Sequence, residues 1–123
     1  MPTILIIDDD PDIIQYLTTF FEDSGYSTVS AVDGEDAINK IGAQKPDLIT
    51  LDIIMPNQTG VKFYRTIKAD ESLKDIPVII ISGVTRYKEL FRRNHKTLPK
   101  PKAFIEKPID RNQVLEKVRE LIG

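Results

Sequence analysis

The sequence predicts an α/β protein built on a doubly wound, five-stranded parallel sheet. Short apolar runs alternate along the 123 residues with longer segments whose apolar side chains recur at helical spacing. The run Val78–Ile81 is apolar at every position, which is typical of parallel strands that are covered by helices on both faces. Five strand–helix units in strict alternation imply right-handed crossovers and helices on both sides of the sheet.

The first unit has the clearest boundaries. Residues 3–7 are predicted to form a buried strand, and Asp10 before Pro11 is a typical helix start. Capping explains Asp10 better than metal binding does. The helix continues through Ile13, Ile14, Leu17, Phe20 and Phe21. We expect Gly25 to end it.

The remaining units follow the same alternation. We expect four more strands, over residues 26–32, 48–51, 78–81 and 103–105. Each is followed by a helix. In order, these helices carry Ala37, Ile38 and Ile41; carry Val61, Tyr64 and Ile67; span about residues 85–96; and carry Val114, Leu115, Val118, Leu121 and Ile122. Asp33 can cap the second helix, and Pro77 opens the fourth strand. Asp110 and Gln113 form a capping-box pair for the last helix.

Length and composition favour one soluble domain that spans residues 1–123. Hydrophobic residues make up 41% and charged residues 29% of the chain, values typical of a globular protein. The chain has no cysteine, which excludes disulfides and thiolate metal sites. No apolar stretch approaches the roughly 20 residues of a membrane span, and no leader pattern opens the chain. We therefore expect a cytoplasmic protein with no membrane partner.

The charges are distributed unevenly along the chain. Residues 1–60 hold eleven acidic and two basic side chains, whereas residues 61–123 hold eight acidic and fifteen basic ones. Much of the basic excess lies between Arg86 and Lys102, where Glu89 is the only acidic residue. A solvated helix face and a surface for a charged partner both fit this pattern. Because the segment contains no recognisable reading helix, we do not expect it to bind nucleic acid.

Two of the predicted strands end in aspartate. Residues 4–7 lead into Asp8 and Asp9, and residues 48–51 lead into Asp52. If these strands are parallel neighbours, their carboxylates gather at the carboxyl edge of the sheet, where open α/β folds place ligands. Ionised carboxylates repel one another, so such a cluster is best explained as an oxygen cage for a hard divalent cation. The sequence therefore predicts a Mg²⁺ site.

Ser82 and Lys107 follow the fourth and fifth strands and complete a set of reactive groups. With the aspartates they offer oxygen ligands, a carboxylate nucleophile, a hydroxyl donor and a fixed cation. Phosphoryl transfer requires such a set, because it depends on positioning and on neutralising charge. Asp52 is already ionised at neutral pH and needs no general base. Taken singly, Ser82 and Lys107 could equally be ordinary turn and loop residues.

The segments that contain these residues resemble the receiver domain of two-component response regulators. They are Ile4–Asp9, Pro46–Pro56 with Gly60, Pro77–Gly83 and Phe104–Pro108. The similarity extends over the whole chain, with the motifs in the family's order and nearly at its spacing. It implies a flavodoxin-like fold with strand order 2-1-3-4-5. It also implies a phosphoacceptor switch rather than an enzyme.

The resemblance assigns a role to each candidate residue. It implies that Asp52 accepts a phosphoryl group from the phosphohistidine of a histidine kinase or a phosphotransfer protein. It further implies that Asp8, Asp9, Asp52 and the backbone carbonyl of Ile54 hold Mg²⁺. Ser82 would help to bind the phosphoryl group.

Two further residues follow from the same resemblance. Lys107 would contact the phosphoryl group, and Phe104 would take the place of an aromatic side chain that moves inward on activation. A core position explains Phe104 equally well. The surface that reports phosphorylation would lie near the fourth helix, the fifth strand and the fifth helix.

Between Ser82 and Lys107 the chain departs from the family pattern. The segment is longer and contains Pro99 and Pro101, so the fourth helix should stop by Leu98. We expect this basic, proline-stiffened segment to form a partner surface of its own. The downstream partner, the cognate kinase and the presence of a homodimer stay open.

Two other functions also stay open. The chain could be a receiver-like interaction module that no longer takes phosphate. It could also be an aspartyl-phosphate phosphatase of the haloacid dehalogenase type, with Asp8 as nucleophile and Asp10 as acid. Against the phosphatase, Pro11 follows where Thr or Val is usual, and Asp52 would have no purpose.

Overall fold

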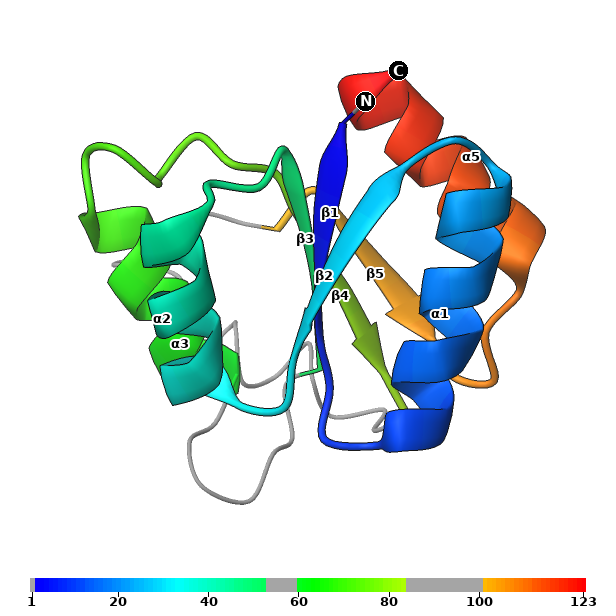
Figure 1. Ribbon diagram of the computed structural model, residues 1–123, viewed down its shortest axis with the longest axis horizontal. Coiled ribbons are helices and arrows are strands. Elements are labelled where there is room, and N and C mark those ends of the chain that lie inside the picture. The colour runs from blue at the N-terminus through cyan, green and yellow to red at the C-terminus, as the bar shows by residue number, and fades with distance from the viewer. Residues whose placement is uncertain (1, 53–59, 84–100) are drawn as a thin grey trace.

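The computed structural model describes residues 2–52, 60–83 and 101–123. Its five strands form one parallel sheet in the order β2-β1-β3-β4-β5. Their bounds are β1 Thr3–Ile7, β2 Ser27–Ala31, β3 Leu48–Leu51, β4 Val78–Ser82 and β5 Ala103–Glu106. The predicted fold class and strand order are confirmed, and β1 and β3 are neighbours (Figure 1).

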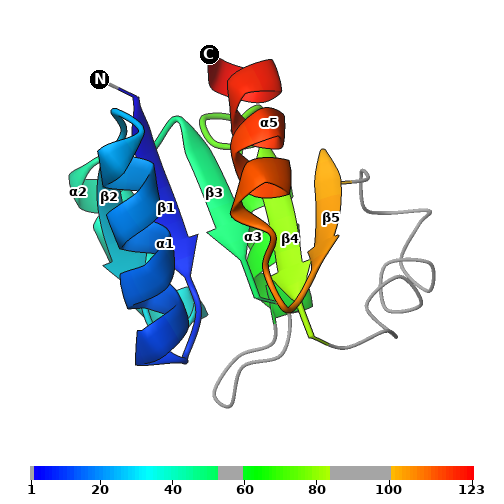
Figure 2. The same cartoon turned by 90° about the vertical axis from the view of Figure 1, so that its right-hand side faces the viewer.

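Helices cover both faces of the sheet. They are α1 Pro11–Asp23, α2 Gly34–Ala43, α3 Gly60–Ala69 and α5 Arg111–Ile122. α1 and α5 lie on one face and α2 and α3 on the other (Figures 1 and 2). The helix expected over about 85–96 lies outside the described residues. Among the helices that the structure describes, none is long and apolar enough to cross a membrane.

Side-chain alternation along the strands builds two cores, one under each helical layer. In β1, Leu5 and Ile7 pack on the side of α2 and α3, whereas Ile4 and Ile6 pack on the side of α1 and α5. Every residue of β1, β3 and β4 is buried. This double burial is the reason that these strands are apolar runs instead of alternating apolar and polar residues.

Aspartate side chains cap three helices at the predicted positions. Asp10, Asp33 and Asp110 each accept a hydrogen bond of 2.8–2.9 Å from a backbone N–H in the first turn of α1, α2 and α5. At the other end of α1, Gly25 has φ +96°, a left-handed conformation that glycine adopts without steric cost. The caps and this glycine explain why the helix boundaries could be found from sequence.

β2 is shorter than the predicted run over residues 26–32. The backbone N–H of Tyr26 donates to the carbonyl of Phe21 and so closes the end of α1. The N–H of Val32 donates to the carboxylate of Asp36 at the start of α2. Both ends of the run therefore serve helix termini, and only Ser27–Ala31 belong to the sheet.

The cap of α2 allows a simple stability test. Asp33→Ala should lower the free energy of unfolding by about 1 kcal/mol, because the backbone N–H of Asp36 loses its acceptor. Urea unfolding followed by circular dichroism measures the effect. Asp33→Asn is the matched control and should retain most of the stability. Equal midpoints for the alanine variant and the wild type would contradict the capping role.

Candidate functional site

The site lies where β1 and β3 end side by side. Ile7 is paired with Leu51 across these strands, so the residues that follow, Asp8 and Asp52, emerge at the same level of the carboxyl edge. The backbone N–H of Asp52 donates to the carbonyl of Ile7 at 3.0 Å. Asp8 is 3% exposed and Asp52 is 7% exposed. The sheet itself thus places two buried carboxylates next to each other.

Asp9 joins these two carboxylates. One carboxylate oxygen from each of Asp8, Asp9 and Asp52 lies within 4.8 Å of the other two. Asp8 and Asp52 are buried, while Asp9 is exposed. A set of three clustered carboxylate oxygens that is open to solvent on one side suits a hard cation that keeps part of its water shell, as Mg²⁺ does. The donor set therefore fits the metal that the sequence predicts.

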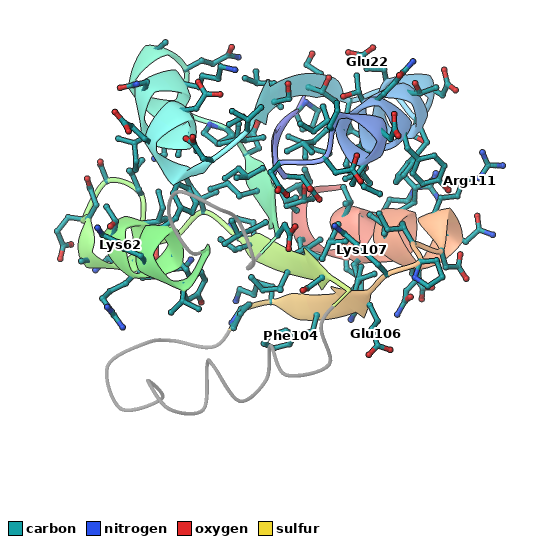
Figure 3. All side chains as sticks on the ribbon, turned by 90° about the horizontal axis from the view of Figure 1, so that it is seen from below. Glu22, Lys62, Phe104, Glu106, Lys107 and Arg111 are labelled. Carbon is teal, nitrogen blue, oxygen red and sulfur yellow. The ribbon has the colours of Figure 1, made fainter. Side chains whose placement is uncertain are left out.

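Lys107, directly after β5, reaches the same cluster. Its Nζ lies 2.9 Å from Oδ2 of Asp8 and 3.5 Å from Oδ2 of Asp52. The side chain is 21% exposed, and Figure 3, which looks onto the carboxyl edge, shows it lying over the sheet. Within the described part of the chain, the ammonium of Lys107 thus contacts two buried carboxylates.

The surroundings of Lys107 act on its pKa in opposite directions. Burial lowers the pKa of the ammonium, but the hydrogen bond from Lys107 to Asp8 and the charges of Asp52 and Asp8 outweigh it. The pKa of Lys107 is therefore raised above its ordinary value. The lysine is a fixed positive charge at neutral pH.

β4 and β5 hold Ser82 beside Lys107. Ser82 is the last residue of β4 and is fully buried. Its carbonyl accepts a hydrogen bond of 3.0 Å from the backbone N–H of Lys107. A Cβ added at Gly83 would lie 3.7 Å from Cβ of Lys107, so the chain passes close to the lysine stem here. The hydroxyl and the ammonium therefore come from adjacent, hydrogen-bonded strand ends.

Phe104 and Ile54 are the other two residues with a predicted role. Phe104 lies within β5, paired with Ile80. It is half-buried and packs against the core on the side of α2 and α3. Figure 3 shows it on the β5 side of the sheet. Ile54, whose carbonyl was expected to bind the metal, lies outside the described residues.

Sequence reasoning missed how Asp8 is oriented. Its Oδ1 accepts a hydrogen bond of 2.9 Å from the backbone N–H of Asp10, while Oδ2 accepts from Lys107. An aspartate that bonds to the backbone two residues further along forms an Asx turn. The close spacing of the aspartates after β1 was the feature of the sequence from which this turn could have been predicted. Asp10 thus helps to fix Asp8 through its main chain and caps α1 through its side chain.

Comparisons with known proteins agree with this arrangement. The family model described as "Response regulator receiver domain" matches residues 4–119. The protein PilH of Pseudomonas aeruginosa is 30% identical over 123 residues, which is 100% of this chain and 99% of PilH. The protein Rrf1 of Nitratidesulfovibrio vulgaris is 29% identical over 107 residues, 87% of this chain and 72% of Rrf1. Other curated relatives are longer: the chain covers 49% of the Synechocystis transcriptional regulator RpaA, at 32% identity over 99% of this chain.

Solved structures of response regulators share the fold of this chain. The response regulator TrrA of Thermotoga maritima, in complex with Mg²⁺ and BeF, superimposes with a TM-score of 0.86 at 27% identity, over 99% of this chain and 100% of TrrA. The chemotaxis protein CheY4 of Vibrio cholerae, at 24% identity, shares the fold with a TM-score of 0.87 over 99% of both chains. Since the family model covers nearly the whole chain, and PilH matches it from end to end, this protein belongs to the family of response regulator receiver domains.

Proposed function

We propose that this receiver domain is a phosphoacceptor and that Asp52 takes a phosphoryl group from the phosphohistidine of a histidine kinase or phosphotransfer protein. One observation carries the proposal. The buried carboxylate of Asp52 lies among Asp8, Asp9 and Lys107 at the carboxyl edge of the sheet. Phosphoryl transfer to a carboxylate depends on positioning and on neutralising charge, and an ionised carboxylate beside a cation site and a fixed ammonium supplies both.

The transfer requires no proton removal at Asp52. An oxygen of its carboxylate forms a bond to phosphorus while the bond between phosphorus and the histidine nitrogen breaks. The imidazole nitrogen keeps the electron pair of that bond, and because the other ring nitrogen carries a proton the leaving group is neutral imidazole. The main obstacle is repulsion between the carboxylate and the anionic phosphoryl group, so the residues around Asp52 act mainly by neutralising charge.

Asp8, Asp9 and Asp52 would hold Mg²⁺, with the backbone carbonyl of Ile54 as the expected further ligand. When bound there, Mg²⁺ supplies positive charge next to the phosphoryl oxygens. Lys107 supplies a second positive charge, since its ammonium already lies near Asp52. Ser82, from the adjacent strand end, would donate its hydroxyl to the phosphoryl group.

Phosphorylation would act as a switch rather than as a step of substrate turnover. Ser82 and Lys107 are joined through the backbone of β4 and β5, so movement of the hydroxyl toward the phosphoryl group would pull on β5. Phe104 lies in the same strand and is only half-buried, so it has room to change its packing. The responding surface is proposed near β5 and α5 and the fourth helix of the family pattern.

Labelling with acetyl phosphate in the presence of Mg²⁺ tests the proposal. We expect one phosphoryl group on Asp52 by peptide mass spectrometry, no label with EDTA, and no label on Asp52→Ala. Asp10→Ala is the matched control and should still label. A label on Asp8 would support the phosphatase instead. A folded protein that binds Mg²⁺ but takes no label would support an interaction module.

A further inference from the structure

Strand β2 forms one edge of the sheet and has a partner strand on one side only. Figure 1 shows it at the front of the sheet, with α2 on one flank and α1 on the other. An edge strand presents unpaired backbone groups, and these can pair with a strand from another chain. Natural proteins usually block such an edge with charged side chains, proline or bulges.

The register identifies the backbone groups of β2 that point away from the sheet. The N–H of Ser27 donates to the carbonyl of Pro2, and the carbonyl of Ala31 accepts from the N–H of Asp8. Residues 27 and 31 therefore face β1. Because successive residues of a strand alternate in direction, the N–H and C=O groups of Thr28, Ser30 and Val32 point outward.

The strand itself contains no blocking residue. Its sequence, Ser-Thr-Val-Ser-Ala, has no charge and no proline, and Thr and Val favour extended structure. Any protection of this edge must therefore come from side chains outside β2.

Lys40 and Asp36 of α2 provide this protection. Nζ of Lys40 donates to the outward carbonyl of Ser30. Oδ2 of Asp36 accepts from the outward N–H of Val32 at 3.2 Å. The two side chains also pair with each other at 3.3 Å. The pair thus covers one outward acceptor and one outward donor at the carboxyl half of the edge.

We propose that Lys40, positioned by Asp36, closes the β2 edge to strand addition by a second copy of this chain. Asp36 is well placed to hold Lys40, because its own backbone N–H is bonded to the α2 cap, Asp33, at 2.8 Å. An incoming strand must displace a charged hydrogen bond to Ser30, which is stronger than the neutral one that it offers. It must also remove the charges of Lys40 and Asp36 from water.

The strand that Lys40 keeps away is β2 of a second copy of this chain. Two β2 edges can pair antiparallel about a twofold axis, and each would then satisfy the outward backbone groups of the other. Glu22 of α1, which accepts a hydrogen bond of 2.8 Å from Oγ1 of Thr28, adds a negative charge beside the edge. This proposal is independent of phosphoryl transfer, since neither Lys40 nor Asp36 belongs to the metal cluster.

Sedimentation velocity across about a hundredfold range of concentration tests the proposal on the full chain. We expect Lys40→Ala to raise the association constant for dimers at least about tenfold over the wild type. In the Lys40→Ala dimer, hydrogen exchange at the amides of Thr28 and Ser30 should slow. Acetyl phosphate labelling of Asp52 should be unchanged, so this result and that of the proposed function are separable.

Two further variants serve as controls. Lys40→Arg keeps a charged donor and should stay as monomeric as the wild type. Lys74→Ala removes the same charge from an ion pair with Glu71 at 3.0 Å, in the turn before the interior strand β4, and should also behave like the wild type. The proposal is overturned if Lys40→Ala associates no more than the wild type, or if its dimer leaves the β2 amides unprotected. Equal association of Lys74→Ala would assign the effect to net charge and overturn it as well.

Discussion

Lys107→Met is expected to lower the free energy of unfolding of the metal-free protein by about 3 kcal/mol, because it removes one partner from a buried ion pair. The ammonium is bonded to Asp8 at 2.9 Å and lies 3.5 Å from Asp52. Both carboxylates are more than nine-tenths buried. Without the lysine, both carboxylates would lose the positive charge that these two contacts supply. Urea unfolding in EDTA measures the loss.

Two comparisons isolate the cause of this loss. Lys117→Met removes an exposed ion pair with Glu120 on α5 and should change stability by less than about 1 kcal/mol. Saturating Mg²⁺ should recover part of the loss in Lys107→Met, because a cation again balances the carboxylates. A loss no larger than that of Lys117→Met would show that the buried carboxylates do not depend on this ammonium.

The same lysine predicts how stability depends on alkaline pH. Its pKa in the folded protein is raised above the ordinary value of 10.5. The unfolded chain therefore loses this proton first, and the stabilisation by Lys107 is fully present below that value. It is lost as the pH rises through the higher folded pKa. This part of the alkaline decline should be absent in Lys107→Met.

Much of the fold could be predicted because its signals are local. The apolar runs that became β1, β3 and β4 are buried on both faces, and the caps at Asp10, Asp33 and Asp110 lie next to the helices that they start. The convergence of Asp8 and Asp52 followed from strand direction together with the strand order that the family resemblance implied. Since parallel strands end at a common edge, knowing that β1 and β3 are neighbours was sufficient.

The details that could not be predicted depend on long side chains and on competing partners. The sequence gives no means to choose which carboxylate a flexible lysine will prefer, and Lys107 lies closer to Asp8 than to Asp52. The ends of β2 were misplaced because Tyr26 and Val32 suit a strand but bond to helix termini instead. The contact of Lys40 with the β2 edge becomes visible only when the strand order is known.

Asp52→Asn is expected to stabilise the metal-free protein and to abolish most of its response to Mg²⁺. In EDTA the described residues of the site bring three carboxylates and the ammonium of Lys107 together, so the carboxylates repel one another, and amide substitution at Asp52 reduces this repulsion. We expect a gain of about 1 kcal/mol, which raises the melting temperature by roughly 4 °C in a domain of this size. Asp9→Asn should give a smaller gain, since Asp9 is exposed and water already screens its charge.

The same substitutions that raise stability in EDTA should reduce the stabilisation that Mg²⁺ provides. A ligand at a hundred times its dissociation constant stabilises the folded state by about 2.7 kcal/mol, and the wild type should approach this gain as Mg²⁺ is added. Asp52→Asn and Asp9→Asn each remove one of three clustered ligands, so their melting temperatures should rise much less. Glu116→Gln, an exposed change on α5, is the control for net charge and should respond like the wild type. Lower melting temperatures in EDTA combined with a full Mg²⁺ response would mean that these carboxylates neither repel one another nor share a metal.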